Sequence, residues 1–234
     1  MGPAAAMPGC RGLNGSAMAA DQDLSVLKGA WAAACAAAGV GRYELAFQLI
    51  EYAYTAPERH YHNVRHIADC LRELTALRPT CRDPLAVEAA LLFHDFEYNP
   101  TRHDNEERSA DEAAMALRAV GWEAPRIQVV RGLILATRHD AAPDTPDAAL
   151  VADIDLAIFG KDEETFDAYE LAIRREYAHV PDDVFRAARS AVLRGFLSRP
   201  RIYATDSCAD RYEMKARQNL GRSLAALWGG RNEK

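Results

Sequence analysis

Histidine is concentrated in one short segment of the chain: three of its seven histidines lie in RHYHNVRH, residues 59–66. Imidazole titrates near neutral pH and is a common metal ligand, so this cluster suits proton transfer or metal binding. If a helix begins near Tyr61, His62 and His66 lie one turn apart on the same face and can point at one site. Taken alone, the segment is equally compatible with two half-buried histidines that bind nothing.

A second candidate is the His-Asp pair in LLFHDFEY, residues 91–98. The apolar residues before the pair predict a buried helix, in which a carboxylate needs a metal ion or another cation as a partner. Adjacent side chains on a helix diverge by about 100°. His94 and Asp95 therefore bind one ion only if that ion lies against the flank of the helix.

A third candidate is LVADIDLAIFG, residues 150–160, in which two aspartates interrupt an otherwise apolar segment. An ionised carboxylate in such surroundings is costly unless it is paired. Asp153 and Asp155 differ by about 200° around a helix, so both should not bind one ion. One of them is expected to be a ligand and the other a capping or supporting group.

In chain order these residues read His, then His-Asp, then Asp, which resembles the H…HD…D signature of the HD superfamily of metal-dependent phosphohydrolases. A longer set of segments is similar to a bacterial family of predicted HD-superfamily phosphohydrolases: RHYHNVRHI, FHDFEYNP, DNEERSADEA, LILATRHD, DIDLAIFG, IRREY and EMKARQNL. The resemblance implies a divalent metal ion held by His66, His94, Asp95 and one Asp of the third segment. Asp155 is favoured because a leucine follows it, as in that family; Asp153 is the alternative.

The roles of the remaining residues also follow from resemblance. YHNVRHIAD is similar to the YHNxxHAxD stretch of cyclic-nucleotide phosphodiesterases, which implies that His62 is the general acid and His66 the metal ligand. Glu106, with Asn105 beside it, is a candidate to act as a base or to position water. The alternative for Asn105 and Glu106 is an N-capped, acid-rich first helical turn.

Substrate contacts are expected from residues near these motifs. IRREY and EMKAR contain Arg174, Arg175, Lys215 and Arg217, and guanidinium groups match phosphate oxygens in two-point contacts. For each of these cations, a solvated helix face or an ion pair with Glu176 or Glu213 is the alternative. The predicted substrate-binding residues are Tyr61, Asn63, His139, Arg174, Tyr177 and Arg217.

The elements that must position these residues are helices. From Asp23 onward, apolar residues recur at spacings of three and four in about ten segments, separated by glycine and proline. The spacing therefore predicts an all-α protein, and the resemblance implies a single compact HD-domain helical bundle spanning residues 23–230. Residues 1–22 are rich in small residues, glycine and proline, and we expect them to be a disordered extension.

Composition limits the class of partner. The 234 residues carry a net charge of -6, which argues against nucleic acid or an anionic membrane surface as the main partner. The five cysteines are odd in number and contain no C-x-x-C pair, which indicates reduced thiols in a cytoplasmic protein. No apolar run approaches the roughly 20 residues of a membrane span. The expected partner is a small phosphorylated substrate, and a homodimer is left open.

These inferences converge on a phosphohydrolase that cleaves a phosphate ester of a small metabolite, with a nucleotide favoured. One ion is expected, and the native metal is open among Mn, Fe, Mg, Co and Ni. Two alternatives remain at this stage: a catalytically silent regulatory module that binds metal and nucleotide, and a di-iron HD oxygenase. The oxygenase needs further ligands, for which the sequence offers His103 and His139.

Overall fold

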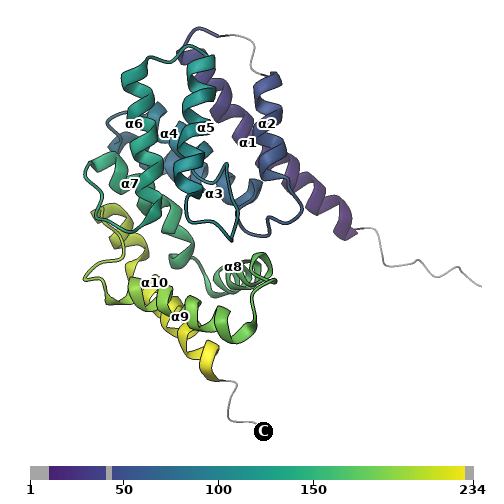
Figure 1. Cartoon of the computed structure of the whole chain (residues 1–234), viewed down its shortest axis with the longest axis vertical. Coiled ribbons are helices and arrows are strands. Elements are labelled where there is room, and N and C mark those ends of the chain that lie inside the picture. Colours follow the sequence, from purple (N-terminus) through teal and green to yellow (C-terminus); the bar gives the residue numbers. More distant parts are fainter. Residues whose placement is uncertain (1–10, 41–43, 230–234) are drawn as a thin grey trace, which may run out of the picture.

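The computed structural model describes residues 11–40 and 44–229, which form ten α-helices, three short 3₁₀ helices and no β-strand (Figure 1). The predicted all-α fold is confirmed. The helices are α1 (Arg11–Ala37), α2 (Glu44–Tyr54), α3 (Val64–Leu77), η1 (Arg78–Thr80), α4 (Pro84–Phe93), α5 (Asn105–Ala119), α6 (Ala124–Leu135), η2 (Ala136–Arg138), α7 (Pro146–Asp155), η3 (Leu156–Gly160), α8 (Glu163–Glu176), α9 (Asp182–Ser198) and α10 (Asp206–Gly229).

Helix α4 occupies the centre of the first seven helices and packs against α1, α3, α5, α6 and α7. Its sequence PLAVEAALLF is apolar on almost every side, and such a helix is stable only when neighbours surround it. Trp31 of α1 packs edge-on against Phe93, with ring centroids 5.8 Å apart. The most buried helix of the bundle therefore ends immediately before His94.

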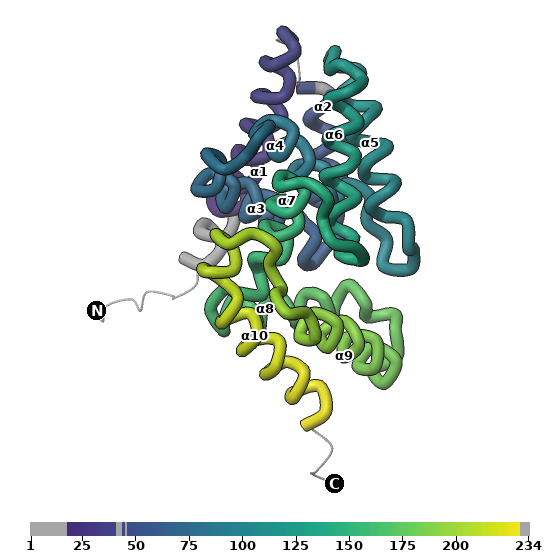
Figure 2. Tube along the Cα trace, turned by 90° about the vertical axis from the view of Figure 1, so that its left-hand side faces the viewer, coloured from purple at the N-terminus to yellow at the C-terminus, as the bar shows by residue number. Residues whose placement is uncertain are grey.

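Helices α8, α9 and α10 form the lower part of the molecule in both views (Figures 1 and 2). They join the rest through η3, against which α10 packs closely. A Cβ added to Gly160 would lie 2.5 Å from the Cβ of Tyr212, so only glycine allows this approach. The close packing fixes the segment that follows Asp155.

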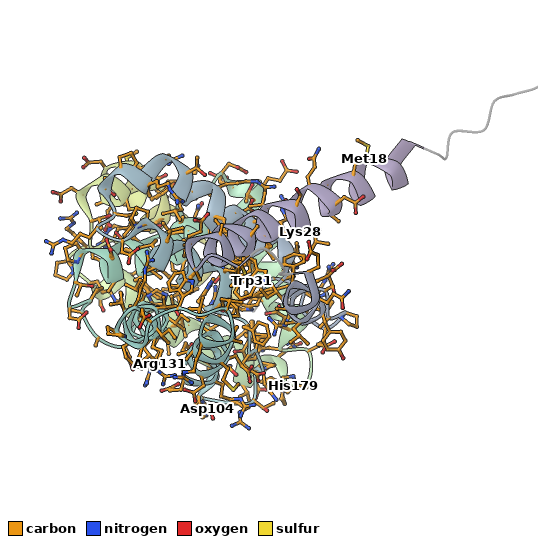
Figure 3. All side chains as sticks on the ribbon, turned by 90° about the horizontal axis from the view of Figure 1, so that it is seen from above. Met18, Lys28, Trp31, Asp104, Arg131 and His179 are labelled. Carbon is orange, nitrogen blue, oxygen red and sulfur yellow. The ribbon has the colours of Figure 1, made fainter. Side chains whose placement is uncertain are left out.

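Helix α1 extends further toward the N-terminus than expected. It begins at Arg11, within the segment 1–22 for which the sequence predicts a disordered extension. The segment SAMAADQ is rich in good helix formers, which explains the extension. Met18 lies on the part of α1 that projects from the body, whereas Trp31 lies within it (Figure 3). Residues 1–10 lie outside the described residues.

Three expected helix boundaries differ in ways that affect the candidate site. Helix α3 begins at Val64, with Asn63 as its N-cap, so His62 precedes the helix. Helix α4 ends at Phe93, which places the His-Asp pair just beyond its last turn. Helix α7 ends at Asp155, and a 3₁₀ turn follows. No described helix is long and apolar enough to cross a membrane.

Candidate metal centre

Four side chains from three parts of the chain converge at the ends of these helices. Nε2 of His66 lies 3.2 Å from Nε2 of His94, 3.3 Å from Oδ2 of Asp95 and 3.2 Å from Oδ1 of Asp155. Nε2 of His94 lies 3.1 Å from the same oxygen of Asp95 and 3.4 Å from that of Asp155. The structure thus brings together the four residues predicted as ligands.

Local structure fixes the direction in which these groups point. His94 caps α4 at its C-terminus, and its Nδ1 lies 3.0 Å from the carbonyl oxygen of Leu91. A carbonyl can only accept, so Nδ1 carries the proton and Nε2 presents its lone pair to the cluster. This backbone contact is the kind of support that orients a metal-binding histidine.

The donor set fits a divalent ion. Oδ2 of Asp95 is buried and has no hydrogen-bond partner, although an orphaned carboxylate oxygen is costly. Ligands at about 2.0–2.2 Å from one ion lie about 3 to 3.5 Å from each other in tetrahedral or octahedral arrangements. The separations in this cluster, 3.1 to 3.4 Å, fall in that range. An ion between the four atoms would bind Asp95 Oδ2, which lies close to both imidazole nitrogens but makes no hydrogen bond with them.

The electrostatics of the cluster favour a cation. Burial raises the pKa of the Asp95 carboxyl, but neighbouring His94 and His62 lower it by a larger amount. The pKa therefore lies well below its usual range. For Asp155 burial also raises the pKa, and hydrogen bonding to His139 and His66 outweighs it. Both carboxylates are therefore ionised. A divalent ion balances their two charges and leaves the imidazoles neutral, which is their ligating form.

Cys70 is a neighbour that sequence reasoning missed. Its Sγ lies 3.9 Å from both ring nitrogens of His66, one helical turn earlier. His66, Cys70, His94 and Asp155 each offer an atom within 4.8 Å of the others, and this group could hold a metal ion. Asp95 approaches the histidines more closely than Cys70 does. The i, i+4 spacing from His66 was the available signal in the sequence.

The two aspartates of the third motif have different environments. Asp155 contributes Oδ1 to the cluster, whereas Asp153 accepts hydrogen bonds from the backbone N–H groups of Ala204 and Thr205 and from the Thr205 hydroxyl. Asp153 therefore anchors the segment that leads into α10. This arrangement supports the preference for Asp155 as the ligand.

His139 approaches the cluster from the opposite side of Asp155. Its Nε2 lies 2.8 Å from Oδ2 of Asp155, which leaves Oδ1 for the ion. His139 has a φ of 56°, the only positive value among the described non-glycine residues. This left-handed conformation costs about 1–3 kcal/mol. A hydrogen bond from Arg199 to the His139 carbonyl helps to hold it.

Glu176 was expected only as an ion-pair partner of nearby arginines, yet it organises the histidine motif. It accepts hydrogen bonds from the backbone N–H groups of Tyr61 and His62, and its Oε2 lies 2.7 Å from Nδ1 of His62. The Tyr98 hydroxyl donates to the same oxygen at 2.9 Å. Glu176 falls on the buried face of α8 defined by Tyr169 and Ile173, a spacing that could have marked it.

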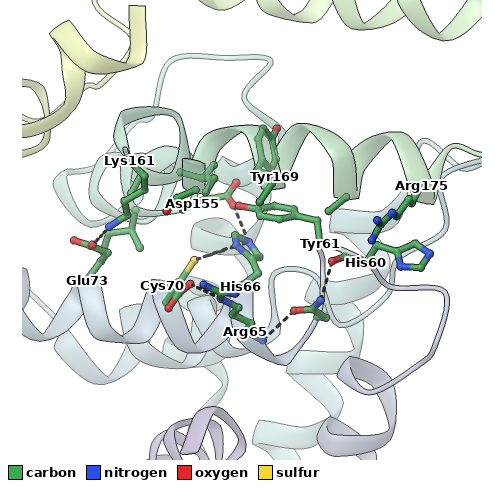
Figure 4. A pocket seen from close by; sticks show the side chains of 18 residues that line it. His60, Tyr61, Arg65, His66, Cys70, Glu73, Asp155, Lys161, Tyr169 and Arg175 are labelled. Atoms are coloured by element: carbon green, nitrogen blue, oxygen red, sulfur yellow. Dashed lines mark hydrogen bonds and ion pairs between the residues drawn. The ribbon is translucent and has the colours of Figure 1, made fainter. Parts of the chain in front are cut away.

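The cluster lies between two cavities. Cavity A, of about 490 Å³, is lined by Asp95, Asp155 and His62 among others. Cavity B, of about 280 Å³, lies on the other side of His66 and reaches Cys70 (Figure 4). Tyr61 and Tyr169 line both cavities, and their rings pack together with centroids 4.5 Å apart.

Among the other predicted residues, Asn105, Glu106, His139 and Tyr177 line cavity A. Burial raises the pKa of Glu106, and the Asp95 charge adds to this effect. Asn105 exchanges two hydrogen bonds with the backbone of Asn99 and so closes the loop before α5. Its amide is therefore occupied in holding the loop rather than free for water.

Three residues predicted to contact substrate make hydrogen bonds within the protein, and one of them, Asn63, also lines cavity B. The Asn63 amide oxygen caps α3 by accepting from the N–H of Arg65. Arg174 binds Asp182 and the carbonyls that follow α8. Arg217 binds Glu213 and carbonyls in the last turn of α9 and just after it. Neither arginine lines cavity A or cavity B, because each satisfies a helix end.

Comparison of the chain with family models, curated proteins and solved structures finds no match. The ligand set and its chemistry therefore rest on the residues and geometry described above.

The two aspartates predict separable effects. Asp155→Asn should weaken binding of Mn²⁺ at least tenfold. Substitution of residues that only support metal ligands already has effects of about this size, and Asp155 is a candidate ligand itself. Asp153→Asn should keep Mn²⁺ affinity but lower the free energy of unfolding by about 1–3 kcal/mol, because an amide cannot accept all three hydrogen bonds. Chelator competition and urea unfolding measure the two quantities. Loss of Mn²⁺ only in Asp153→Asn would contradict the assignment.

The environment of Glu176 predicts a pH dependence of stability. Burial raises its pKa, but the contacts with His62 and the backbone N–H groups lower it to about 2, from 4.5. A depressed carboxyl pKa stabilises the fold above the unfolded value, and this stabilisation is lost as pH falls through the folded value. Metal-free Glu176→Gln should therefore be less stable than the wild type at pH 7 by about 1–3 kcal/mol. Urea unfolding should show the difference shrinking from pH 4.5 toward pH 2; a constant difference would refute it.

Proposed function

We propose that the chain is a metal-dependent phosphohydrolase that cleaves a phosphate ester of a small metabolite, with a nucleotide as the favoured type. The observation that carries the proposal is that Asp95 and Asp155, which lie within 3.1–3.4 Å of the His66 and His94 imidazoles, line the same cavity as His62 and Glu106. Ligands for an electrophilic ion, a proton donor and a carboxylate base thus face one space. This is the set of groups that phosphate ester hydrolysis requires.

The order of the ligands along the chain supports this class. The His, His-Asp, Asp sequence that resembles the HD superfamily corresponds to side chains that converge in space. Within the described residues, one group of His, Cys, Asp and Glu has ligand atoms close enough to share an ion. His103 lines cavity A but does not belong to that group. This supports one ion rather than the pair that the oxygenase alternative needs.

When bound at this cluster, a divalent ion would lower the pKa of a water molecule and polarise the phosphorus centre. The protein's part is to hold the four ligands in position before binding occurs. The backbone contact of His94 and the contact between His139 and Asp155 both serve this end.

His62 is suited to donate a proton to the leaving oxygen. Glu176 engages Nδ1, and Nε2 makes no hydrogen bond with the described residues. The ring stacks on Tyr98 with centroids 4.0 Å apart, which limits its rotation. Glu176 and Tyr98 therefore act as positioning residues that keep Nε2 available to a substrate in cavity A.

Glu106 is suited to accept a proton from water. It lies in the first turn of α5 and lines cavity A together with Asp95 and Asp155. Its raised pKa brings a carboxylate closer to the range in which it exchanges protons near neutral pH. The cavity volume, about 490 Å³, lies within the roughly 300–1,000 Å³ typical of sites for small ligands.

The two histidines of the opening motif should give different defects. His66→Ala should lose Mn²⁺, whereas His62→Asn should keep Mn²⁺ and lose turnover. For an alkyl phosphate the loss in kcat should be about 10²–10⁴-fold, the usual contribution of general acid catalysis. For 4-nitrophenyl phosphate the loss should be much smaller, because its leaving oxygen needs little protonation.

Metal analysis followed by phosphate-release kinetics on both esters tests this expectation. Equal losses on the two esters, with Mn²⁺ retained, would mean that His62 positions phosphate or water. No phosphate release from any ester by the Mn²⁺-loaded wild type would refute the proposed function.

A further inference from the structure

Cavity A has two unlike walls. One wall carries the polar groups that precede and begin α5, together with His139. The other is formed by η3, α8 and α9 and presents mainly apolar side chains: Ile158, Phe159, Ile173, Val192 and Phe196. A polar reaction centre therefore faces an apolar surface across one space. The chemistry proposed above makes no use of the second wall.

The apolar wall is continuous with the metal ligands. Asp155 is the last residue of α7, and Ile158 and Phe159 follow it within η3. A phosphate held at Asp155 therefore has its ester group close to the wall formed by η3 and α9. His62 lines the same cavity, so the group it would protonate, the leaving alcohol, lies in that space.

Arg189 of α9 is the one arginine in this wall. It is 9% exposed; its Nη2 donates to the Tyr169 hydroxyl at 2.7 Å, and Nε and Nη2 both donate to Glu170. Its Nη1 makes no hydrogen bond with the described residues. Nη1 is not among the described side-chain atoms that are fully buried without a hydrogen bond, which are Asp95 Oδ2 and Glu107 Oε2. Because Arg189 lines cavity A, Nη1 is the guanidinium donor left for a ligand there.

Glu170 decides what kind of group this donor suits. Its two oxygens face Arg189, and Ser223 donates to it as well, so the carboxylate is held against the guanidinium. The charge of Arg189 is thereby balanced within the protein. A second anion would also meet the Glu170 charge, whereas a neutral acceptor such as a carbonyl or ring nitrogen would not. The pair therefore favours a neutral acceptor over a second phosphate.

We infer that Arg189 and the apolar wall form a subsite for the leaving group, which takes a flat apolar ring bearing a neutral hydrogen-bond acceptor. The rings of Phe159 and Phe196, with centroids 5.1 Å apart, provide the apolar contact. Nη1 of Arg189 binds the acceptor on the ring. This inference rests on the proposed function, because it names the class of phosphate monoester that the site cleaves.

A matched pair of ligands isolates the hydrogen bond. 2-(3-Pyridyl)ethylphosphonate and 2-phenylethylphosphonate have the same shape, differ by one ring atom and cannot be hydrolysed. Calorimetry on the Mn²⁺-loaded wild type should show about tenfold tighter binding of the pyridyl compound, as expected for a bond to a charged donor. In Arg189→Lys, which keeps a cation beside Glu170 but loses Nη1, the two affinities should become equal. Equal affinities in the wild type, or an unchanged ratio in the variant, would overturn the inference.

A second pair of variants isolates the apolar wall. Val192 lines cavity A and is 46% exposed, whereas Val184 on the same helix is 52% exposed and does not line it. Val192→Trp should lower kcat/KM for benzyl phosphate at least fivefold more than for ethyl phosphate. Val184→Trp should leave both values at the wild-type level. Equal losses on the two esters in Val192→Trp would mean that no ring subsite exists there.

The two sets of measurements separate this inference from the proposed function. Binding preference without phosphate release would uphold the ring subsite and refute hydrolysis. Phosphate release together with equal affinities for the pyridyl and phenyl phosphonates would uphold hydrolysis and refute the subsite.

Discussion

The structure depends on the burial of two carboxylates against two imidazoles. Asp95 and Asp155 are ionised in surroundings that penalise charge, and Oδ2 of Asp95 is left without a hydrogen bond. Such an arrangement needs positive charge to balance it. Without metal the imidazoles supply that charge: burial lowers the pKa of His66 and of His94, but the surrounding groups raise both pKa values well above the usual range. A divalent ion relieves both penalties at once, because it binds the orphaned oxygen and balances the charge. The convergence is therefore better explained as a binding site than as packing.

Helix ends, more than helix faces, build this site. α4 ends just before His94 and α7 ends at Asp155, so two helix C-termini meet at the cluster. The free carbonyls of a helix C-terminus carry partial negative charge, which favours a cation nearby. The 3₁₀ turn after α7 then carries the chain directly into the apolar wall of cavity A. The change from α-helix to 3₁₀ helix after Asp155 thus positions both this candidate ligand and the apolar wall of cavity A.

The fold class and three of the candidate ligands could be predicted from local pattern, whereas the grouping of His66 with them followed from the family resemblance. Spacings of three and four predict helices, and charged residues within apolar runs mark His94, Asp95 and Asp155. Helix boundaries were harder to predict. The helix was expected to begin near Tyr61 and to include His62, but it begins at Val64. The role of Glu176 depends on a contact with His62, more than 100 residues away in the chain. The role of Arg189 depends on a contact between two helices, α9 and α8. The predicted phosphate contacts of Arg174 and Arg217 stay predictions, and in the structure both side chains bind groups at nearby helix ends.

The central claim is that His66, His94, Asp95 and Asp155 together hold one divalent ion. A crystal structure of the protein grown with Mn²⁺, with anomalous differences measured at the manganese edge, tests it most directly. The account predicts one strong peak within about 2.0–2.3 Å of two Nε2 atoms, Asp95 Oδ2 and Asp155 Oδ1. A peak that has Cys70 Sγ in place of Asp95, or no peak between these side chains at saturating Mn²⁺, would contradict it.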